Sequence, residues 1–272
     1  MPFSPAPSVR IPGDLARGNR FGFLGDSITI VDTAPNAMLT EYHVHLAHLS
    51  GGRIEWGKKA GLAGATTTQI LATHLPTLLA YPIRPDRVIV LAGTNDCTTA
   101  TVATATANLA AIYRALRAAG IEPIAATLTP RIGFTTPQRA VYDGICRFVA
   151  RHAGENGYPL IDFASAMTAD DGNWLDPAWT ADNVHPTIAG ARKMADVAWA
   201  ALQPTLVPSS ALLPASNADI TGLANPLFLT DSNADGIPDG WSLNSGPGGT
   251  KALVDATTDA AGNWFEISKN TT

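Results

Sequence analysis

Residues 20–27 read RFGFLGDS, a short apolar run that ends in a glycine, an aspartate and a serine. A continuous apolar run of this length, closed by turn residues, is typical of a strand buried on both faces of a parallel sheet. Four further short β-branched or apolar runs follow, at residues 53–56, 86–91, 122–128 and 158–161. The sequence therefore predicts five short strands, of which residues 20–25 form the first.

Helical patterns separate these strands. Apolar residues repeat at helical spacing over residues 98–119 and 187–202, and Pro76 should kink or split a helix near 68–79. Alternating strands and helices predict an α/β fold with a parallel sheet between two helical layers. We expect a flavodoxin-like three-layer α/β/α sandwich with strand order 2-1-3-4-5, plus a short C-terminal β-rich segment.

Three more polar segments follow the later strands: GLAGATT at 61–67, GTND at 93–96 and DNVH at 182–185. The carboxyl ends of parallel strands meet at one edge of a sheet, which is where open α/β sheets bind their ligands. Together with the GDS at 25–27, these segments are therefore expected to converge. In this order they resemble the four blocks of the SGNH hydrolases, or GDSL esterase/lipase superfamily, from about residue 21 to residue 202.

The resemblance implies a serine esterase that forms an acyl-enzyme. Ser27 is the candidate nucleophile, His185 the candidate general base, and Asp182 the carboxylate that orients the histidine. A serine hydroxyl needs such a base, and a histidine titrates in the right range to supply it. Ser27 could instead cap a helix, and the Asp182–His185 pair could be an exposed loop salt bridge.

The resemblance also implies an oxyanion hole made by the amides of Ser27 and Gly64 and by the Asn95 side chain. A side chain at Gly64 would block the approach of the backbone to the substrate. Asn95 could alternatively form a turn. Asp26 and Asp96 are expected to brace their loops.

The chain departs from the family pattern at three places. Lys59 stands where the family usually has asparagine, and Ala65 stands where an aspartate is common. The first block reads GDSIT instead of GDSLS. These changes leave the candidate catalytic groups intact but bear on loop bracing and substrate preference.

Composition narrows the function. The chain has 272 residues, of which 46% are hydrophobic. Its net charge of −5 does not indicate the basic surface that nucleic-acid binding requires. No apolar run is long enough to cross a membrane. The proline-rich N-terminus is not typical of a secretory signal, so the sequence predicts a cytoplasmic or phage virion-associated protein. Cys97 and Cys146 are expected to be free thiols, and the oligomeric state stays open.

A group of three histidines, His43, His45 and His48, suggests a metal site at first sight. On a helix only two of them share a face, and no acidic or cysteine partner is placed nearby. We expect them to lie on a solvated helix face, and we expect no cofactor to be needed for catalysis.

The proposed domains are an N-terminal arm (1–18), the hydrolase domain (19–205), a proline/serine-rich linker (206–222) and a partial β-rich module (223–272) that is a candidate for carbohydrate binding. The module contains DSNADGIPDGW at 231–241, with oxygen-bearing side chains at alternate positions and a glycine at the sixth position. It resembles half of an EF-hand loop. Calcium could bind there, or the loop could be rich in Asx turns without metal. The candidate ligands are Asp231, Asn233, Asp235 and Asp239.

We expect short acyl esters, acetyl first, and O-acetylated carbohydrate as a substrate class. The alternative is a glycan-binding or phage-tail structural protein with a vestigial hydrolase domain. The intact set of candidate catalytic residues favours the enzyme.

Overall fold

The computed structural model describes residues 18–30, 37–206, 230–240, 250–255 and 263–268. Its main feature is a parallel five-stranded sheet of order β2-β1-β3-β4-β5. The strands are β1 (Arg20–Gly25), β2 (Glu55–Gly61), β3 (Arg87–Leu91), β4 (Glu122–Ala126) and β5 (Leu160–Ile161). The predicted fold class and strand order are confirmed.

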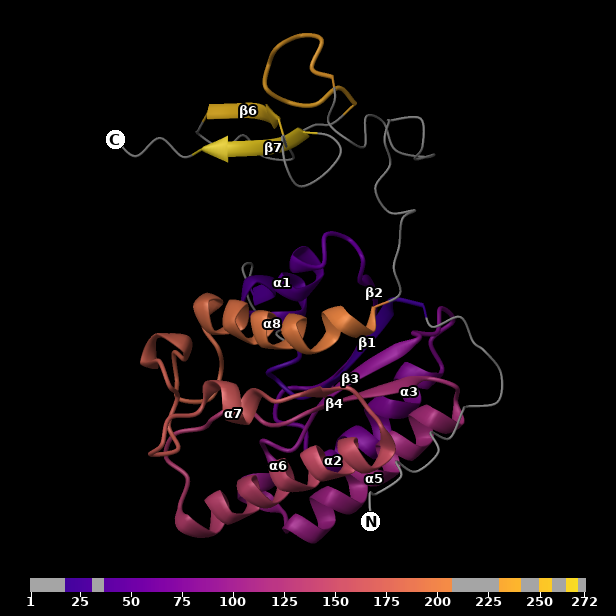
Figure 1. Ribbon diagram of the computed structural model, residues 1–272, viewed down its shortest axis with the longest axis vertical. Coiled ribbons are helices and arrows are strands. Elements are labelled where there is room, and N and C mark those ends of the chain that lie inside the picture. Colours follow the sequence, from indigo (N-terminus) through magenta and orange to yellow (C-terminus); the bar gives the residue numbers. More distant parts are fainter. Residues whose placement is uncertain (1–17, 31–36, 207–229, 241–249, 256–262, 269–272) are drawn as a thin grey trace, which may run out of the picture. The chain divides into compact units, whose positions relative to one another are not determined.

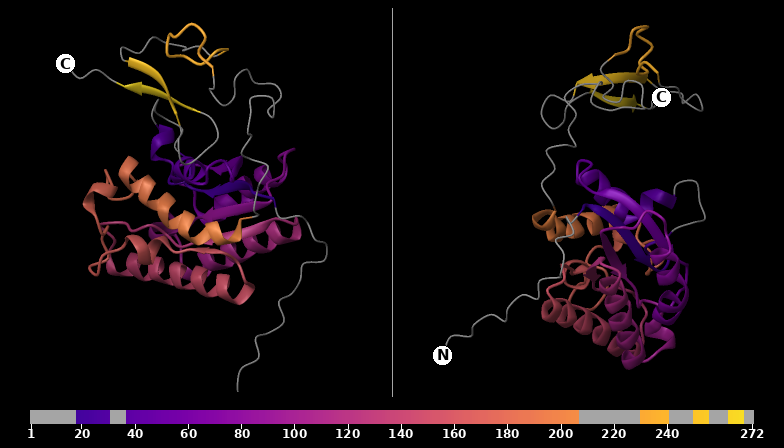
Figure 2. Two further views of the ribbon diagram at one scale, coloured as in Figure 1. Left: turned by 45° about the horizontal axis from the view of Figure 1, so that its top comes forward. Right: turned by 90° about the vertical axis from the view of Figure 1, so that its right-hand side faces the viewer.

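Helices form a layer on each face of the sheet (Figure 1). Helices α1 (Tyr42–Leu49) and α8 (Ile188–Leu202) pack together on one face, and α5 (Val102–Ala118) and α6 (Thr136–Asn156) pack on the other. The two further views show the same three layers (Figure 2). The shorter helices are α2 (Thr67–Gln69), α3 (Leu75–Leu79), α4 (Asp96–Thr99) and α7 (Phe163–Met167), and the single-turn elements are η1 (Ala37–Thr40), η2 (Ile70–His74), η3 (Pro177–Trp179) and η4 (Gln203–Thr205).

The core follows from the apolar runs. Every residue of β3 is buried, and so are Phe21, Phe23 and Leu24 of β1, because helices cover both faces of these central strands. Arg87 is the one charged residue of β3, and its side chain is 1% exposed. Its Nε lies 2.9 Å from Glu122 Oε2, and its two terminal nitrogens donate to the hydroxyl and the carbonyl oxygen of Thr205 at 3.0 and 2.7 Å. A buried guanidinium needs such partners.

Glycines let the ends of three strands approach closely. Gly25 and Gly61 are level in the sheet, and a Cβ at Gly61 would lie 2.0 Å from the Gly25 carbonyl oxygen. A Cβ at Gly25 would lie 2.4 Å from the carbonyl oxygen of Leu91 at the end of β3. Both positions therefore require glycine, and the segments after β1, β2 and β3 begin side by side.

One local prediction was partly wrong, and another is confirmed. The second strand was expected at residues 53–56 but spans Glu55–Gly61, because β2 is an edge strand that tolerates Lys58 and Lys59. The helix near Pro76 is split as expected, into α2, a π-helical turn η2 and α3, with the proline in the first turn of α3.

The chain separates into two compact units, residues 1–207 and 208–272. In the second unit, β6 (Thr250–Asp255) pairs antiparallel with β7 (Asn263–Ser268). The predicted arm apart from Gly18, and nearly all of the predicted linker, lie outside the described residues. None of the helices in the described ranges combines the length and the apolar character that a bilayer crossing requires.

Candidate active site

Ser27 lies in a tight turn directly after β1. The amides of Thr29 and Ile30 both donate to the carbonyl oxygen of Asp26 at 3.0 Å, and the Ile28 amide donates to Asp26 Oδ1 at 3.0 Å. The turn leaves Ser27 partly exposed while its neighbours Asp26 and Ile28 are buried. The side chain of Ser27 is thus presented at the carboxyl edge of the sheet.

His185 and Asp182 meet Ser27 at this edge. Ser27 Oγ lies 2.8 Å from His185 Nε2, and His185 Nδ1 lies 2.6 Å from Asp182 Oδ2. The other carboxylate oxygen, Asp182 Oδ1, accepts from the amides of His185 and Val184 at 2.7 and 3.0 Å. The carboxylate therefore shapes its own loop and binds the imidazole at the same time. Such a chain of contacts can move a proton from the hydroxyl to the imidazole.

Gly64 and Asn95 come from the loops after β2 and β3. Asn95 Nδ2 donates to the carbonyl oxygen of Ala65 at 3.1 Å, which joins the two loops. Gly64 has φ +76°, and a Cβ built there would meet no atom within 4 Å. The backbone conformation itself therefore requires glycine, a reason different from the blocked substrate approach expected from the sequence.

A second contact between these loops involves Asp96, the expected brace. Its buried carboxylate accepts from the amide and the hydroxyl of Thr67 at 2.8 and 2.5 Å. Asn108 of α5 donates to the same hydroxyl at 3.1 Å. Thr67 was not singled out from the sequence, although it belongs to the GLAGATT block. The two loops are thus fixed as one unit.

The histidine loop is held by Asn183 of the DNVH block and by Thr180, which no motif indicated. Asn183 adopts φ 70°, a left-handed conformation that asparagine tolerates better than most residues. Its carbonyl oxygen accepts from Ile132 N at 3.0 Å and from Trp174 Nε1 at 3.4 Å. The Thr180 hydroxyl donates to the His185 carbonyl oxygen at 2.9 Å. The asparagine in DNVH was the only available signal for this arrangement.

Two carboxyl groups at the site have shifted pKa values in opposite directions. Burial raises the pKa of Asp26 to about 6, against the Ile28 hydrogen bond, and Oδ2 finds no hydrogen-bond partner within the described ranges. Partial burial works against ionisation of Asp182 as well. There the hydrogen bonds from the His185 ring and from the two amides prevail, and the pKa of Asp182 lies below its ordinary value.

The solvated helix face expected for the three histidines is wrong for His43. His43 is buried, whereas His45 is partly exposed and His48 is exposed. Cys97 and Cys146 are free thiols, as predicted, and burial raises the pKa of each to about 12. Burial makes both thiols weak nucleophiles.

The candidate calcium ligands lie on the turn segment 230–240. Asp231 accepts from the amides of Asp235 and Gly236 at 3.2 and 2.8 Å, and Asp239 accepts from the amide and hydroxyl of Ser232 at 3.0 and 2.6 Å. Asn233 Nδ2 donates to Asp235 Oδ2 at 3.0 Å. Across all the described segments, no three acidic, histidine or cysteine side chains are grouped as a metal site. Calcium binding here stays a prediction.

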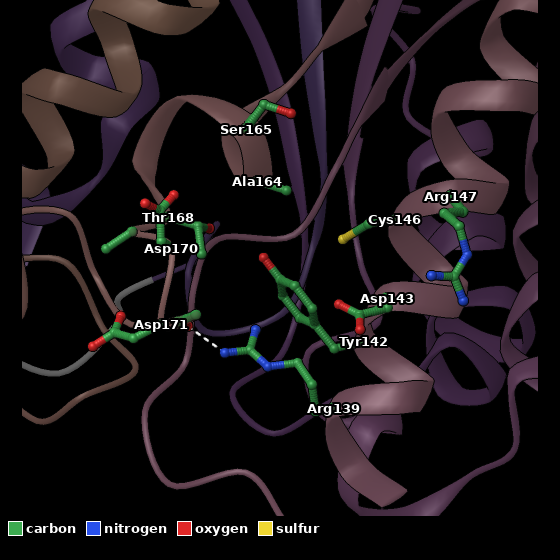
Figure 3. Close-up of a pocket in the computed structure, with 12 residues that line it drawn as sticks. Arg139, Tyr142, Asp143, Cys146, Arg147, Ala164, Ser165, Thr168, Asp170 and Asp171 are labelled. Atoms are coloured by element: carbon green, nitrogen blue, oxygen red, sulfur yellow. Dashed lines mark hydrogen bonds between the residues drawn. The ribbon is translucent and has the colours of Figure 1, made fainter. Parts of the chain in front are cut away.

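A separate polar cleft of about 490 Å³ lies between α6 and the segment 168–172 (Figure 3). Arg139 reaches across it to the carbonyl oxygen of Gly172. Neither Ser27, Asp182, His185, Gly64 nor Asn95 lines this cleft. It is thus distinct from the edge where the four sequence blocks meet.

Solved structures share this fold. A protein of the G-D-S-L family from Desulfitobacterium hafniense DCB-2 is 22% identical, with a TM-score of 0.58 over 68% of this chain and 100% of its own. An acetylxylan esterase from Geobacillus stearothermophilus, a catalytic mutant, is 21% identical, with a TM-score of 0.55 over 68% and 94%. A lipase/acylhydrolase from Enterococcus faecalis is 22% identical, with a TM-score of 0.55 over 70% and 98%.

No curated protein matches the chain in sequence. The family model of the GDSL-like lipase/acylhydrolase family matches residues 23–193, which include the segments around Ser27, Gly64, Asn95, Asp182 and His185. With the fold and this match together, the chain belongs to the GDSL-like lipase/acylhydrolase family.

Proposed function

We propose that the protein is a serine esterase that hydrolyses short acyl esters through an acyl-enzyme, with Ser27, His185 and Asp182 as its catalytic triad. The observation that carries the proposal is the pair of contacts at His185, 2.8 Å to Ser27 Oγ and 2.6 Å to Asp182 Oδ2. With Nδ1–H donated to Asp182, the Nε2 lone pair faces the serine hydroxyl and can accept its proton.

In the first half of the reaction, Ser27 Oγ attacks the ester carbonyl carbon while its proton moves to His185 Nε2. The negative charge forms on the former carbonyl oxygen, for which the amides of Ser27 and Gly64 and the Asn95 side chain are the proposed donors. Asn95 Nδ2 gives one hydrogen to Ala65, so its second hydrogen is left for this oxygen. The intermediate collapses, and the leaving alcohol takes the proton from His185.

In the second half, water attacks the acyl-serine ester and passes its proton to His185. The second intermediate collapses, Ser27 recovers its proton from His185, and the carboxylic acid leaves. No residue outside this set has to accept or release a proton. This geometry gives no support to the alternative, a binding protein with a vestigial hydrolase domain.

Acetylated carbohydrate is the substrate class we favour. A solved structure with this fold is described as an acetylxylan esterase, which supports acetyl sugars as the first substrates to test. Residues 223–272, within the second unit, are the proposed carbohydrate-binding module. Acetyl, butyryl and palmitoyl esters of one chromogenic alcohol, together with acetylated xylan, would rank acyl length and sugar preference.

The direct test is labelling with a fluorophosphonate, which reacts with activated serines. Wild-type protein should be labelled and should lose ester turnover in proportion, and Ser27→Ala should show neither labelling nor turnover. Ser165→Ala is the matched control, because Ser165 is exposed on α7 and should leave both intact. A folded Ser27→Ala protein with near wild-type turnover would contradict the mechanism.

A further inference from the structure

A charged cluster, with Glu41 and His43 buried and Lys59 partly exposed, lies between β2 and the start of α1. The Glu41 side chain is 0% exposed, and its Oε1 lies 2.7 Å from Lys59 Nζ. His43 Nε2 lies 3.5 Å from the other oxygen, Oε2. A carboxylate buried this deeply is costly unless a cation pairs with it. Lys59 supplies that cation, at the position where the sequence departs from the family pattern.

His43 connects this cluster to the turn that carries Ser27. Its Nε2 lies 2.9 Å from the carbonyl oxygen of Thr29, two residues after Ser27. The ring is held in place by Phe23 and Trp56, whose ring centroids lie 4.5 and 5.1 Å away. A neutral imidazole with its hydrogen on Nε2 donates to the Thr29 carbonyl. The Ser27 turn is therefore held by the His43 side chain in addition to the backbone hydrogen bonds within the turn.

Burial of the His43 ring favours this neutral form. Burial lowers the pKa of His43 to about 4; the Thr29 hydrogen bond and Glu41 act against this shift, and Lys59 and His45 add to it. Asp26 is a further carboxyl group nearby, acting on Tyr42, the neighbour of His43 in α1. At neutral pH the cluster thus pairs Glu41 with Lys59 beside a neutral His43 imidazole.

We propose that Glu41, His43 and Lys59 are positioning residues for Ser27, in which Lys59 balances Glu41 and His43 holds the Thr29 carbonyl. The proposal rests on the proposed role of Ser27 as the nucleophile. None of the three touches the reacting atoms. Their contribution is to keep Ser27 Oγ within hydrogen-bond distance of His185, where small displacements are expected to slow the chemistry.

Removing the lysine charge should create a new proton-binding event. In Lys59→Met, Glu41 and His43 are left with one buried negative charge, and the pair can restore neutrality by taking up a proton. The unfolded states of the variant and the wild type bind the same protons at this pair. The folded variant binds more protons there than the folded wild type does. The stability of the variant relative to wild type must therefore fall as pH rises.

The experiment is thermal unfolding at pH 5.5 and pH 8.5. The melting temperature of Lys59→Met should fall further below that of wild type at pH 8.5 than at pH 5.5, by roughly 5 °C for a shift of one to two pKa units in a domain of this size. Lys59→Arg should remove most of this difference, and so should the double variant Glu41→Gln/Lys59→Met. Lys58→Met is the matched control, because Lys58 lies beside Tyr81 and outside the cluster.

Kinetics then separate positioning from stability alone. At a temperature where all variants are folded, Lys59→Met should lower kcat by about tenfold with little change in KM, because the turn moves but the substrate surface does not. Lys59→Arg should recover kcat.

Equal destabilisation at both pH values, or an unchanged kcat in Lys59→Met, would overturn the inference while leaving the serine mechanism standing. A wild-type protein without ester turnover would instead overturn the proposed function and the positioning role with it.

Discussion

Two substitutions of Asp182 should lower kcat by different amounts. The more conservative one, Asp182→Asn, should cause the larger loss. Asp182 Oδ1 accepts from two backbone amides, so in Asp182→Asn the side-chain carbonyl oxygen must take that place. The Asn NH₂ group then faces His185 Nδ1. The imidazole must accept there and carry its hydrogen on Nε2, which is the wrong tautomer for taking the Ser27 proton. In Asp182→Ala the imidazole is free to choose either tautomer.

The structure sets the size of the difference. For the wrong tautomer, the loss in kcat is expected to be roughly 10⁴-fold, the size known for the same change in another serine hydrolase. In the alanine variant, one charge-assisted hydrogen bond of about 1.5–3 kcal/mol and a loop cap of about 1 kcal/mol are lost, or roughly 10²–10³-fold. Water can partly replace the carboxylate, because the side chains of His185 and Asp182 are 45% and 53% exposed.

The assay is steady-state hydrolysis of an acetyl ester by both variants, with circular dichroism to check folding. Added formate or acetate should partly rescue Asp182→Ala, since the gap is open to solvent, and should not rescue Asp182→Asn. Asp176→Ala is a suitable control, because the Asp176 carboxylate also accepts from a backbone amide, that of Ala178. An alanine variant as slow as the asparagine variant, or slower, would refute the tautomer argument.

Three more outcomes are expected. Asn95→Ala should lower kcat by roughly 10²–10³ with a modest change in KM, and an effect on KM alone would assign Asn95 to ground-state binding. Burial raises the pKa of Asp26 to about 6, so the stability tied to its neutral form is present at low pH and lost as pH rises from about 4 to 6. Asp26→Asn should therefore be more stable than wild type by up to about 3 kcal/mol at pH 7.5 and about equal at pH 4, as measured by urea unfolding; lower stability at pH 7.5 would contradict this. A chain ending at Val207 should fold and keep its activity. One ending at residue 203 lacks the Thr205 contacts to buried Arg87 and should be less stable by about 2–4 kcal/mol in the same assay, so equal stability would argue against that anchor.

Local patterns in the sequence predicted the parts of the protein that depend on neighbours in the chain. The first strand has the predicted bounds, Arg20–Gly25, because a short apolar run closed by glycine is typical of a strand buried on both faces of a sheet. The positions of Ser27 and His185 followed from strand ends that share one edge. The second strand was misplaced because Lys58 and Lys59 look polar, and periodicity does not reveal that a strand lies at an edge.

Features that depend on distant packing could not be predicted. Helical spacing alone does not show that the His43 side of α1 is buried against β1 and β2, so His43 was placed in solvent. The pairing of Glu41 with Lys59 joins residues from two different elements with no shared motif. Gly64 also has a positive φ, a backbone reason for glycine that the sequence motif did not reveal.

The proposed nucleophile and base are separated by 158 positions in the chain, and His185 lies just before α8, which packs against α1. A growing polypeptide therefore holds its serine long before it holds the base that activates it. Contacts this far apart in sequence form late, since a long loop must close first. Ester turnover should thus begin only when the last helix of the sheet domain has docked. In a refolding experiment, a chromogenic ester added at time zero would report the arrival of α8 without any attached label.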